Sequence, residues 1–279
     1  MKHLIASIVF AVDRRLPAPR VGGRESAAAY SKWEYAAGKA ILDSYASHFG
    51  ELRGRLVLDV GCGLGGKAVA YAEAGARVIG VDVERKNVER SAAFASGCSG
   101  ARFLAGDVER LPFADASFDL VVANDSLEHF RDPGAALREV ARVLKPGGSI
   151  FIFFTPWRSP LGSHLYDYIH TPWCHLLFPE WLIRALLERA AAARGAADPA
   201  AEAERLMGEY HAELNRITLG RYRRILKDNP RLELVHEELK PPKFRFLRFL
   251  TRVPYVGEPF VGTVVGILRK EREGSSSGG

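Results

Sequence analysis

A run of glycines beside one carboxylate is the strongest chemical signal in the sequence. The stretch LVLDVGCGLGG, residues 56–66, is typical of an apolar strand that ends at Asp59, followed by a tight turn and a helix. Gly61, Gly63 and Gly65 lack Cβ atoms, so the backbone can turn sharply and a ligand can approach it closely. A carboxylate at the strand end would repel a diphosphate and attract an ammonium group. The pattern therefore favours a cationic ligand. The same run also satisfies GxGxxG, so a nicotinamide-dependent dehydrogenase is the alternative.

Two further acidic residues follow the next strand-like segments. Asp82 ends ARVIGVD, where an acid can accept hydrogen bonds from both hydroxyls of a ribose, and Val83 beside it would pack on an adenine. Asp107 comes directly after the third strand. It is placed to accept a hydrogen bond from an adenine amino group while the backbone of Val108 contacts the ring edge. The alternatives are a helix-capping role for Asp82 and an ordinary loop turn at Asp107.

The fourth strand ends in a crowded polar loop, FDLVVANDSLEHFRDP, residues 118–133. Asn124 is expected to face the ligand crevice, because the carboxyl ends of the strands open on it. Asp125, Glu128 and His129 follow within five residues of the strand. His129 is a candidate general base or substrate contact, and a structural role in the loop is the alternative.

Strand-like and helix-like segments alternate around these residues. We predict strands at 55–60, 77–81, 101–105, 118–123 and 149–154, helices at 66–74, 84–95 and 133–144, and two late strands at 232–236 and 262–268. This alternation predicts an α/β fold with a parallel sheet covered on both faces. A longer helix is expected over 26–49, with Tyr30 and Trp33 either next to a bound ligand or packing in the core.

The composition of the sequence and its pattern of apolar residues change after the fifth strand, and we divide the chain at this point. The expected parts are an N-terminal helical cap (1–54), the cofactor-binding core (55–155), a mainly helical insertion on the substrate side (156–230), the last two strands (231–270) and a disordered tail (271–279). The insertion contains His164 and Tyr166, which we expect in a lid over the acceptor, with one of them as a general base. Core packing of this irregular segment is the alternative.

Composition restricts the partners. The net charge is +6 and the pI is about 9.3, which suits acidic ligands, phosphates or anionic membrane surfaces, although a solvated surface is the simplest explanation. The three cysteines form no CxxC pair, so we expect a reducing cytoplasm and no zinc site. The apolar segment 1–12 is too short to span a bilayer and is expected to dock on the protein, or else to lie at a membrane interface. The basic run 240–252 could join such a peripheral contact. Nucleic acid is not the expected partner, because no RNA-binding module is visible.

The motifs LVLDVGCGLGG, VIGVD, GDVERLPF, FDLVVANDSLEHF and LREVARVLKPGGSIFI, in this order, resemble the class I S-adenosylmethionine methyltransferases. They look most similar to the group that includes the ubiquinone and menaquinone biosynthesis methyltransferases. The resemblance covers residues 56–155. It implies a Rossmann-like, doubly wound, seven-stranded sheet with an antiparallel last strand. It also implies that Asp59, Gly61 and Gly63 hold the methionine end of the cofactor, Asp82 the ribose, and Asp107 with Val108 the adenine.

The resemblance implies transfer of a methyl group from S-adenosylmethionine to a small-molecule or lipid-like acceptor, with O-methylation expected before C-methylation. His129, His164 and Tyr166 are the candidate catalytic residues. Some ubiquinone O-methyltransferases bind a divalent metal in the loop after the fourth strand, and Asp125, Glu128 and His129 match that spacing, but we expect no metal here. A cofactor-binding scaffold without catalysis is a third hypothesis. The resemblance does not specify the acceptor or the oligomeric state.

Overall fold

The computed structural model describes residues 1–18, 22, 26–242 and 257–272. The chain divides into two compact units. The first comprises Met1–Val21, Thr155–Leu219 and Leu239–Thr263, and the second comprises Gly22–Phe154, Gly220–Glu238 and Val264–Gly279. The N-terminal stretch 1–54 therefore contributes to both units. Most of the basic run 240–252 and of the tail 271–279 lies outside the described residues.

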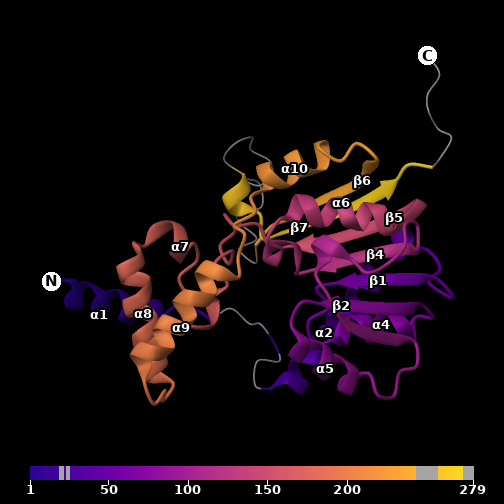
Figure 1. Ribbon diagram of the computed structural model, residues 1–279. Helices are drawn as coiled ribbons and strands as arrows, with labels where there is room; N and C mark the ends of the chain where they lie inside the picture. Colours follow the sequence, from indigo (N-terminus) through magenta and orange to yellow (C-terminus); the bar gives the residue numbers. More distant parts are fainter. Residues whose placement is uncertain (19–21, 23–25, 243–256, 273–279) are drawn as a thin grey trace. The chain divides into compact units, whose positions relative to one another are not determined.

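The second unit is built on one seven-stranded sheet (Figure 1). Its strands are β1 (Leu56–Val60), β2 (Arg77–Asp82), β3 (Ala101–Ala105), β4 (Phe118–Asn124), β5 (Leu144–Phe154), β6 (Leu232–Lys240) and β7 (Thr263–Lys270), in the spatial order β3-β2-β1-β4-β5-β7-β6. The pairs among β1 to β5 are parallel, and β7 runs antiparallel to β5. The predicted Rossmann-like fold class is confirmed. The chain order reverses between β1 and β4, which is the topological switch point where ligands bind in such sheets.

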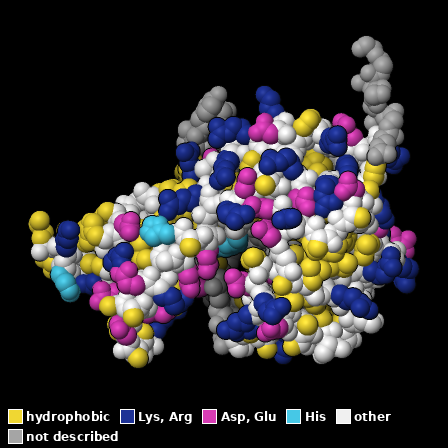
Figure 2. All heavy atoms as spheres, in the orientation of Figure 1, with side chains coloured by type: hydrophobic (Ala, Val, Ile, Leu, Met, Phe, Trp, Pro, Cys, Tyr) yellow, Lys and Arg dark blue, Asp and Glu magenta, His cyan; other side chains and the backbone are white. Residues whose placement is uncertain are grey.

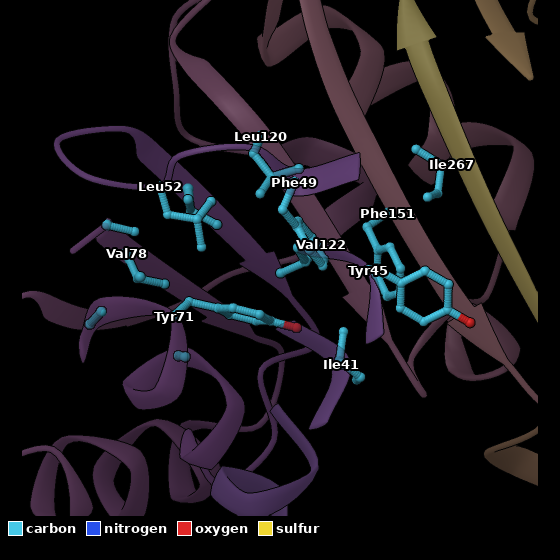
Figure 3. Packing of buried hydrophobic residues seen from close by; sticks show 14 of the residues in the cluster. Ile41, Tyr45, Phe49, Leu52, Tyr71, Val78, Leu120, Val122, Phe151 and Ile267 are labelled. Carbon is cyan, nitrogen blue, oxygen red and sulfur yellow. The ribbon is translucent and has the colours of Figure 1, made fainter. Parts of the chain in front are cut away.

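One face of the sheet is covered by α2 (Ala27–Ser44), α3 (Ala46–Phe49) and α4 (Gly66–Glu73), while α5 (Arg85–Phe94) packs on β2 and β3. Aromatic side chains of the helices fill the space above the branched side chains of the strands (Figure 3). The labelled members of this core are Ile41, Tyr45, Phe49, Leu52, Tyr71, Val78, Leu120, Val122, Phe151 and Ile267. Because a parallel sheet is covered on both faces, the residues that alternate with these along the strands, such as Val121, are also buried.

The opposite face is covered by α6 (Pro133–Val143) and α10 (Leu219–Lys227). Val121 and Ala123 of β4 face Leu137 and Val140 of α6, and the Tyr222 ring of α10 lies 5.1 Å from that of Phe154. Three predicted boundaries are wrong by four residues or more, and one of them is the late strand predicted over 232–236, which runs to Lys240. The helix expected over 26–49 breaks at Tyr45, whose backbone leaves the helical region and whose hydroxyl donates to Glu238. The fifth strand begins at Leu144, before the glycines, because Leu144 already pairs with Phe118.

The first unit is mainly helical. It contains α1 (Lys2–Asp13), α7 (Cys174–Leu177), α8 (Glu180–Ala193), α9 (Pro199–Ala212) and the 3₁₀ turns η3 (Leu165–Asp167) and η5 (Glu258–Phe260). Its core joins α8 and α9 to α1 and to the segment around η3, with Ile169, Leu186 and Leu187 fully enclosed. No helix in the described part of the chain is long and apolar enough to cross a membrane. On the face shown in Figure 2, acidic side chains lie among the Lys and Arg side chains.

Candidate active site

The polar side chains singled out in the sequence meet at the carboxyl edge of the sheet. In the register, Val60 at the end of β1 pairs with Val81, and Asp82 at the end of β2 pairs with Ala105. Asp59 pairs with Val122 of β4, two residues before the end of that strand. The strand ends of β1, β2, β3 and β4 are therefore level, as the spacing of the motifs predicts.

The loop after β1 needs glycine for steric reasons. Gly61, Gly63 and Gly65 have φ of +70°, +55° and +80°, a region that L side chains rarely adopt. A Cβ atom at Gly61 would lie 2.5 Å from the Ser126 Cβ atom. The loop is also tied to β2, since the Gly61 and Cys62 amides both donate to the Val81 carbonyl at 2.8 and 3.0 Å. The sequence therefore fixes a rigid turn directly above the strand ends.

Asp59 is a buried acid whose charge is not balanced by hydrogen bonds. Its exposed fraction is 2%, and its Oδ2 atom has no hydrogen-bond partner among the described residues. Burial raises the pKa of Asp59 to about 7, and the nearby carboxylates of Glu34 and Asp82 add to the rise, while Lys67 opposes it. A buried carboxylate without a partner is costly in a folded protein. An ammonium group next to this atom would remove that cost.

Asp82 is positioned by hydrogen bonds at both carboxylate oxygens. Its Oδ2 accepts from the Gly63 amide at 3.0 Å. Its Oδ1 accepts from the Glu84 amide at 2.9 Å and from the Asn87 side chain at 3.2 Å. The capping alternative does not hold, because the N-cap of α5 is Glu84 and no side chain caps this helix. The Asp82 carboxylate instead holds the turn that leads into it. Each carboxylate oxygen has two lone pairs, so the same geometry leaves acceptor capacity for a ribose hydroxyl.

The candidate adenine contacts lie at the ends of β2 and β3. Val83 is 72% exposed, so its side chain is accessible to a ligand. Asp107 accepts the Glu109 amide at 2.9 Å through Oδ1 and thereby caps the 3₁₀ turn η1 (Val108–Arg110). This is the ordinary turn role considered as the alternative for Asp107. Val108, the first residue of that turn, is buried.

Asn124 connects the site to the core. Its amide nitrogen donates to the Tyr71 hydroxyl at 2.9 Å, and its Oδ1 atom is buried without a hydrogen-bond partner among the described residues. Tyr71 is fully buried in the core between α4 and the sheet. A packed aromatic residue therefore sets the direction of the Asn124 side chain at the end of β4.

A buried lysine lies at the same edge and was not identified from the sequence. Lys67 is 6% exposed, and its Nζ atom lies 2.9 Å from Asp125 Oδ2 and 3.3 Å from the Asn124 carbonyl oxygen. Burial alone would lower the pKa of Lys67, but the charges of Asp125 and Glu34 outweigh it and raise that pKa. The surrounding carboxylates therefore favour the charged form of Lys67 at the switch point. The Asp125 carboxylate forms an ion pair with it.

Glu34 of α2 completes the cluster and was also missed. It is 5% exposed, and Oε2 accepts the Gly66 amide at 3.3 Å. Its Oε1 lies 2.9 Å from the point that a Cβ atom on Gly63 would occupy, so the carboxylate lies directly against the glycine loop. Burial raises the pKa of Glu34 to about 7, opposed by the charge of Lys67. The sequence carried no hydrophobic signal for it, because the buried face of α2 consists of Ser31, Glu34, Gly38 and Ile41, of which only Ile41 is a large apolar residue.

The candidate catalytic residues are divided between the two units. His129 belongs to the second unit and ends the turn η2 (Leu127–His129), where its amide donates to the Ser126 carbonyl at 2.9 Å and its side chain is exposed. His164 and Tyr166 belong to the first unit, with ring centroids 6.0 Å apart at η3. His164 has φ of +57°, a strained conformation for a residue other than glycine. In α2, the rings of Tyr30 and Trp33 stack 5.4 Å apart.

Comparison with known proteins shows which family the segment around this edge of the sheet is similar to. Residues 58–152 match the methyltransferase domain family. The matched segment runs from β1 to β5 and contains the glycine loop and all four strand ends. These residues are therefore similar to a methyltransferase domain, and the sheet that contains them has the strand order and the antiparallel last strand of the Rossmann-like methyltransferase fold. The finer assignment to the ubiquinone and menaquinone group stays a prediction.

Individual relatives are also methyltransferases by name, and each is similar to about two-fifths of the chain or less. An uncharacterized methyltransferase of Mycobacterium leprae is 37% identical over 111 residues, which cover 40% of this chain and 41% of that protein. The uncharacterized methyltransferase YcgJ of Bacillus subtilis is 42% identical over 98 residues, covering 34% of this chain and 39% of the relative. The chain thus spans about two-fifths of the length of the curated relatives it matches.

Solved structures show that the likeness in fold extends beyond the matched domain. The YcgJ structure from Bacillus subtilis superposes with a TM-score of 0.52 at 22% identity and covers 86% of this chain and all of that one. A geranyl diphosphate C-methyltransferase from Streptomyces coelicolor, solved with Mg²⁺, geranyl diphosphate and S-adenosyl-L-homocysteine, has a TM-score of 0.54 at 18% identity, covering 87% of this chain and 84% of that one. At these identities the comparison shows a likeness of fold alone.

Proposed function

We propose that the chain is an S-adenosylmethionine-dependent methyltransferase that acts on a small-molecule or lipid-like acceptor, with O-methylation preferred to C-methylation. One observation carries the proposal. At the switch point of a methyltransferase domain, the buried carboxylate oxygen Asp59 Oδ2 and the buried amide oxygen Asn124 Oδ1 lack hydrogen-bond partners among the described residues. Both are acceptors, so they fit a ligand that brings cationic or hydrogen-bond-donating groups.

The residues of the cluster fit the amino-acid end of this cofactor. An amino-acid group has one ammonium and one carboxylate, and the cluster offers both signs of charge. We assign the ammonium to Asp59 and Glu34, two buried acids beside the glycine loop, and the carboxylate to Lys67. Asp82 then serves the ribose, and Val83, Asp107 and Val108 the adenine. A diphosphate would meet two buried acids at this place, which disfavours a dehydrogenase.

When bound, S-adenosylmethionine supplies a methyl group on a positively charged sulfur, so the leaving group is already activated. The protein has to align the acceptor with that methyl group and to exclude water. A base is required only when the acceptor is a protonated hydroxyl or an acidic carbon. His129 follows the end of β4 and is accessible, so we assign it to accept the acceptor's proton. His164 and Tyr166 are assigned to acceptor binding in the first unit.

Methyl transfer can be tested without knowing the acceptor. The purified chain is incubated with S-adenosylmethionine carrying a ¹³C-methyl group and with lipid and metabolite extracts, and products are sought by the mass gain of one labelled methylene. The carbon chemical shift of the transferred methyl group then separates O-methylation from C-methylation. We expect Asp59→Asn to abolish the product and His129→Gln to lower kcat with cofactor affinity kept. Binding of NADH in place of S-adenosylmethionine would refute the proposal. Cofactor binding without any product would favour a scaffold.

A further inference from the structure

Helix α1 has two apolar sides, of which only one is packed. Its inner side carries Ala6, which is 1% exposed and belongs to the core of the first unit. Its outer side carries Leu4, Ile8 and Val12, which are 66%, 56% and 54% exposed. These three follow one another at intervals of four residues, so they form a stripe along the helix. Ile5 extends this stripe at 39% exposed. We call these four residues the α1 stripe.

The direction of the α1 stripe is fixed because α1 is tied to its unit at both ends. Near its start, Arg189 of α8 donates to the His3 carbonyl at 3.3 Å. At its end, Asp13 Oδ1 accepts the amide and the hydroxyl of Thr171, both at 2.7 Å. Arg14 donates to the Tyr168 carbonyl at 2.5 Å and to Asp13. The outward apolar side is therefore a feature of the folded unit rather than of a loose end.

Exposed apolar surface is concentrated on this helix. Ten large hydrophobic side chains are exposed in the described part of the chain, and five of them lie within residues 1–12. Figure 2 shows hydrophobic side chains with a Lys or Arg among them where Figure 1 places α1. Single exposed hydrophobic residues are ordinary, but a continuous stripe of them marks a binding surface.

The exposed Lys and Arg side chains within residues 1–18 have no exposed acid beside them in that segment. Lys2 and Arg15 are exposed at the two ends of the helix. The acid within residues 1–18 is Asp13, which is 1% exposed and ion-paired with Arg14 at 2.7 Å. The surface around the α1 stripe thus presents cations without an exposed acid of its own segment. That combination is complementary to an anionic partner with an apolar interior.

We propose that α1 docks the first unit on an anionic lipid bilayer, lying in the plane of the interface with the α1 stripe inserted below the headgroups and Lys2 and Arg15 at the phosphates. Its 12 residues are far too short to span the bilayer, but they suit an interfacial helix. The inference goes beyond methyl transfer and does not depend on it.

Sedimentation with lipid vesicles tests the proposal on the full chain without cofactor. Vesicles of phosphatidylcholine alone are compared with vesicles that contain phosphatidylglycerol. We expect the wild-type chain to sediment with the anionic vesicles, and added salt to weaken that binding. In the variant Leu4→Gln/Ile8→Gln we expect at least a tenfold loss of vesicle affinity, since two aliphatic side chains no longer leave water.

A matched control removes exposed apolar surface elsewhere. Leu234→Gln/Val235→Gln changes two side chains of β6 that are 40% and 42% exposed, and its vesicle affinity should equal that of the wild type. Equal thermal melting of both variants shows that they fold. The proposal fails if the wild-type chain does not sediment with anionic vesicles or if Leu4→Gln/Ile8→Gln binds them as well as wild type. It also fails if the wild-type chain has no affinity for lipid and forms a dimer by light scattering that Leu4→Gln/Ile8→Gln abolishes.

Discussion

Replacing Lys67 by methionine tests how the cluster recognises a ligand. The substitution keeps the length and most of the volume of the side chain and removes its charge. Lys67 now donates to Asp125 at 2.9 Å and to the Asn124 carbonyl at 3.3 Å. If it donates to the cofactor carboxylate in the complex, its removal costs one charge-assisted hydrogen bond, which is about 1.5–3 kcal/mol. Since ~1.4 kcal/mol is a factor of ten, the Kd for S-adenosylhomocysteine should rise by roughly tenfold to a hundredfold.

The assay compares two ligands by isothermal titration calorimetry. S-adenosylhomocysteine has the amino-acid end, and 5′-methylthioadenosine has the same adenosine and sulfur without it. We expect Lys67→Met to weaken the first and to leave the second within about a factor of two, which is the ordinary variation of such measurements. Lys32→Met, which removes an exposed lysine from α2, is the control and should change neither Kd.

The same variant has a second readout in pH. The charge of Lys67 lowers the pKa of both Asp59 and Glu34, so its loss should move the pH dependence of cofactor affinity upward. Folding should survive, because the Asp125 side chain is 38% exposed and can be solvated by water once its partner is gone. An equal loss for both ligands would indicate general damage to the pocket. Tighter binding of S-adenosylhomocysteine would refute the assignment, since it would mean that Lys67 competes with the ligand for the acids.

Three further outcomes are expected. Asp82→Ala should lower cofactor affinity by more than tenfold in calorimetry, since it removes a charged acceptor, with thermal melting close to wild type; unchanged affinity would remove Asp82 from the ribose site. Gly63→Ala should destabilise the fold by about 1–2 kcal/mol in urea unfolding, because its φ is +55° and the new Cβ would lie 2.9 Å from Glu34; wild-type stability would contradict the strained turn. Asp59 and Glu34 attract a cation only when they are ionised, and burial raises the pKa of both to about 7. The affinity for S-adenosylmethionine should therefore fall as pH is lowered through 7, and binding at pH 7 should release protons. An affinity that does not change with pH would show that neither acid faces the ligand.

The sequence specified the sheet and the strand-end residues well because both are local properties. Asp82 and Asn124 are the last residues of their strands and Asp59 is the next to last of its own, and parallel strands bring their carboxyl ends to one edge. Their positions therefore follow from the chain order and the strand period alone. The boundary at Leu144 did not follow, since it depends on pairing with Phe118 across a register shift.

Helix α2 shows why the rest of the site escaped prediction. The apolar spacing of Tyr30, Trp33 and Ile41 indicates one face, but Ser31, Glu34 and Gly38 are the more deeply buried. Small residues allow this: a Cβ atom on Gly38 would lie 3.0 Å from the Lys67 Cα atom, so α2 and α4 pack almost backbone to backbone. Hydrophobic periodicity detects large side chains that leave water. It does not detect a contact made by a serine, a glycine and a buried acid.

Lys67 and Glu34, which sequence reasoning missed, also explain how an acidic pocket can exist without its ligand. Three carboxylates, Glu34, Asp59 and Asp125, surround the glycine loop and the end of β4. Lys67 neutralises Asp125, and burial keeps the pKa of the other two near 7, so part of the population holds protons in place of a counterion. A cation that enters must displace those protons, which makes its affinity depend on pH. A phosphate gains no charge attraction from either state of these two acids, because the protonated acids carry no positive charge and the ionised acids repel it. Under the proposed function, selectivity for an adenosyl cation over a dinucleotide would come from the burial of Glu34 and Asp59, with the glycine loop bringing the ligand against them.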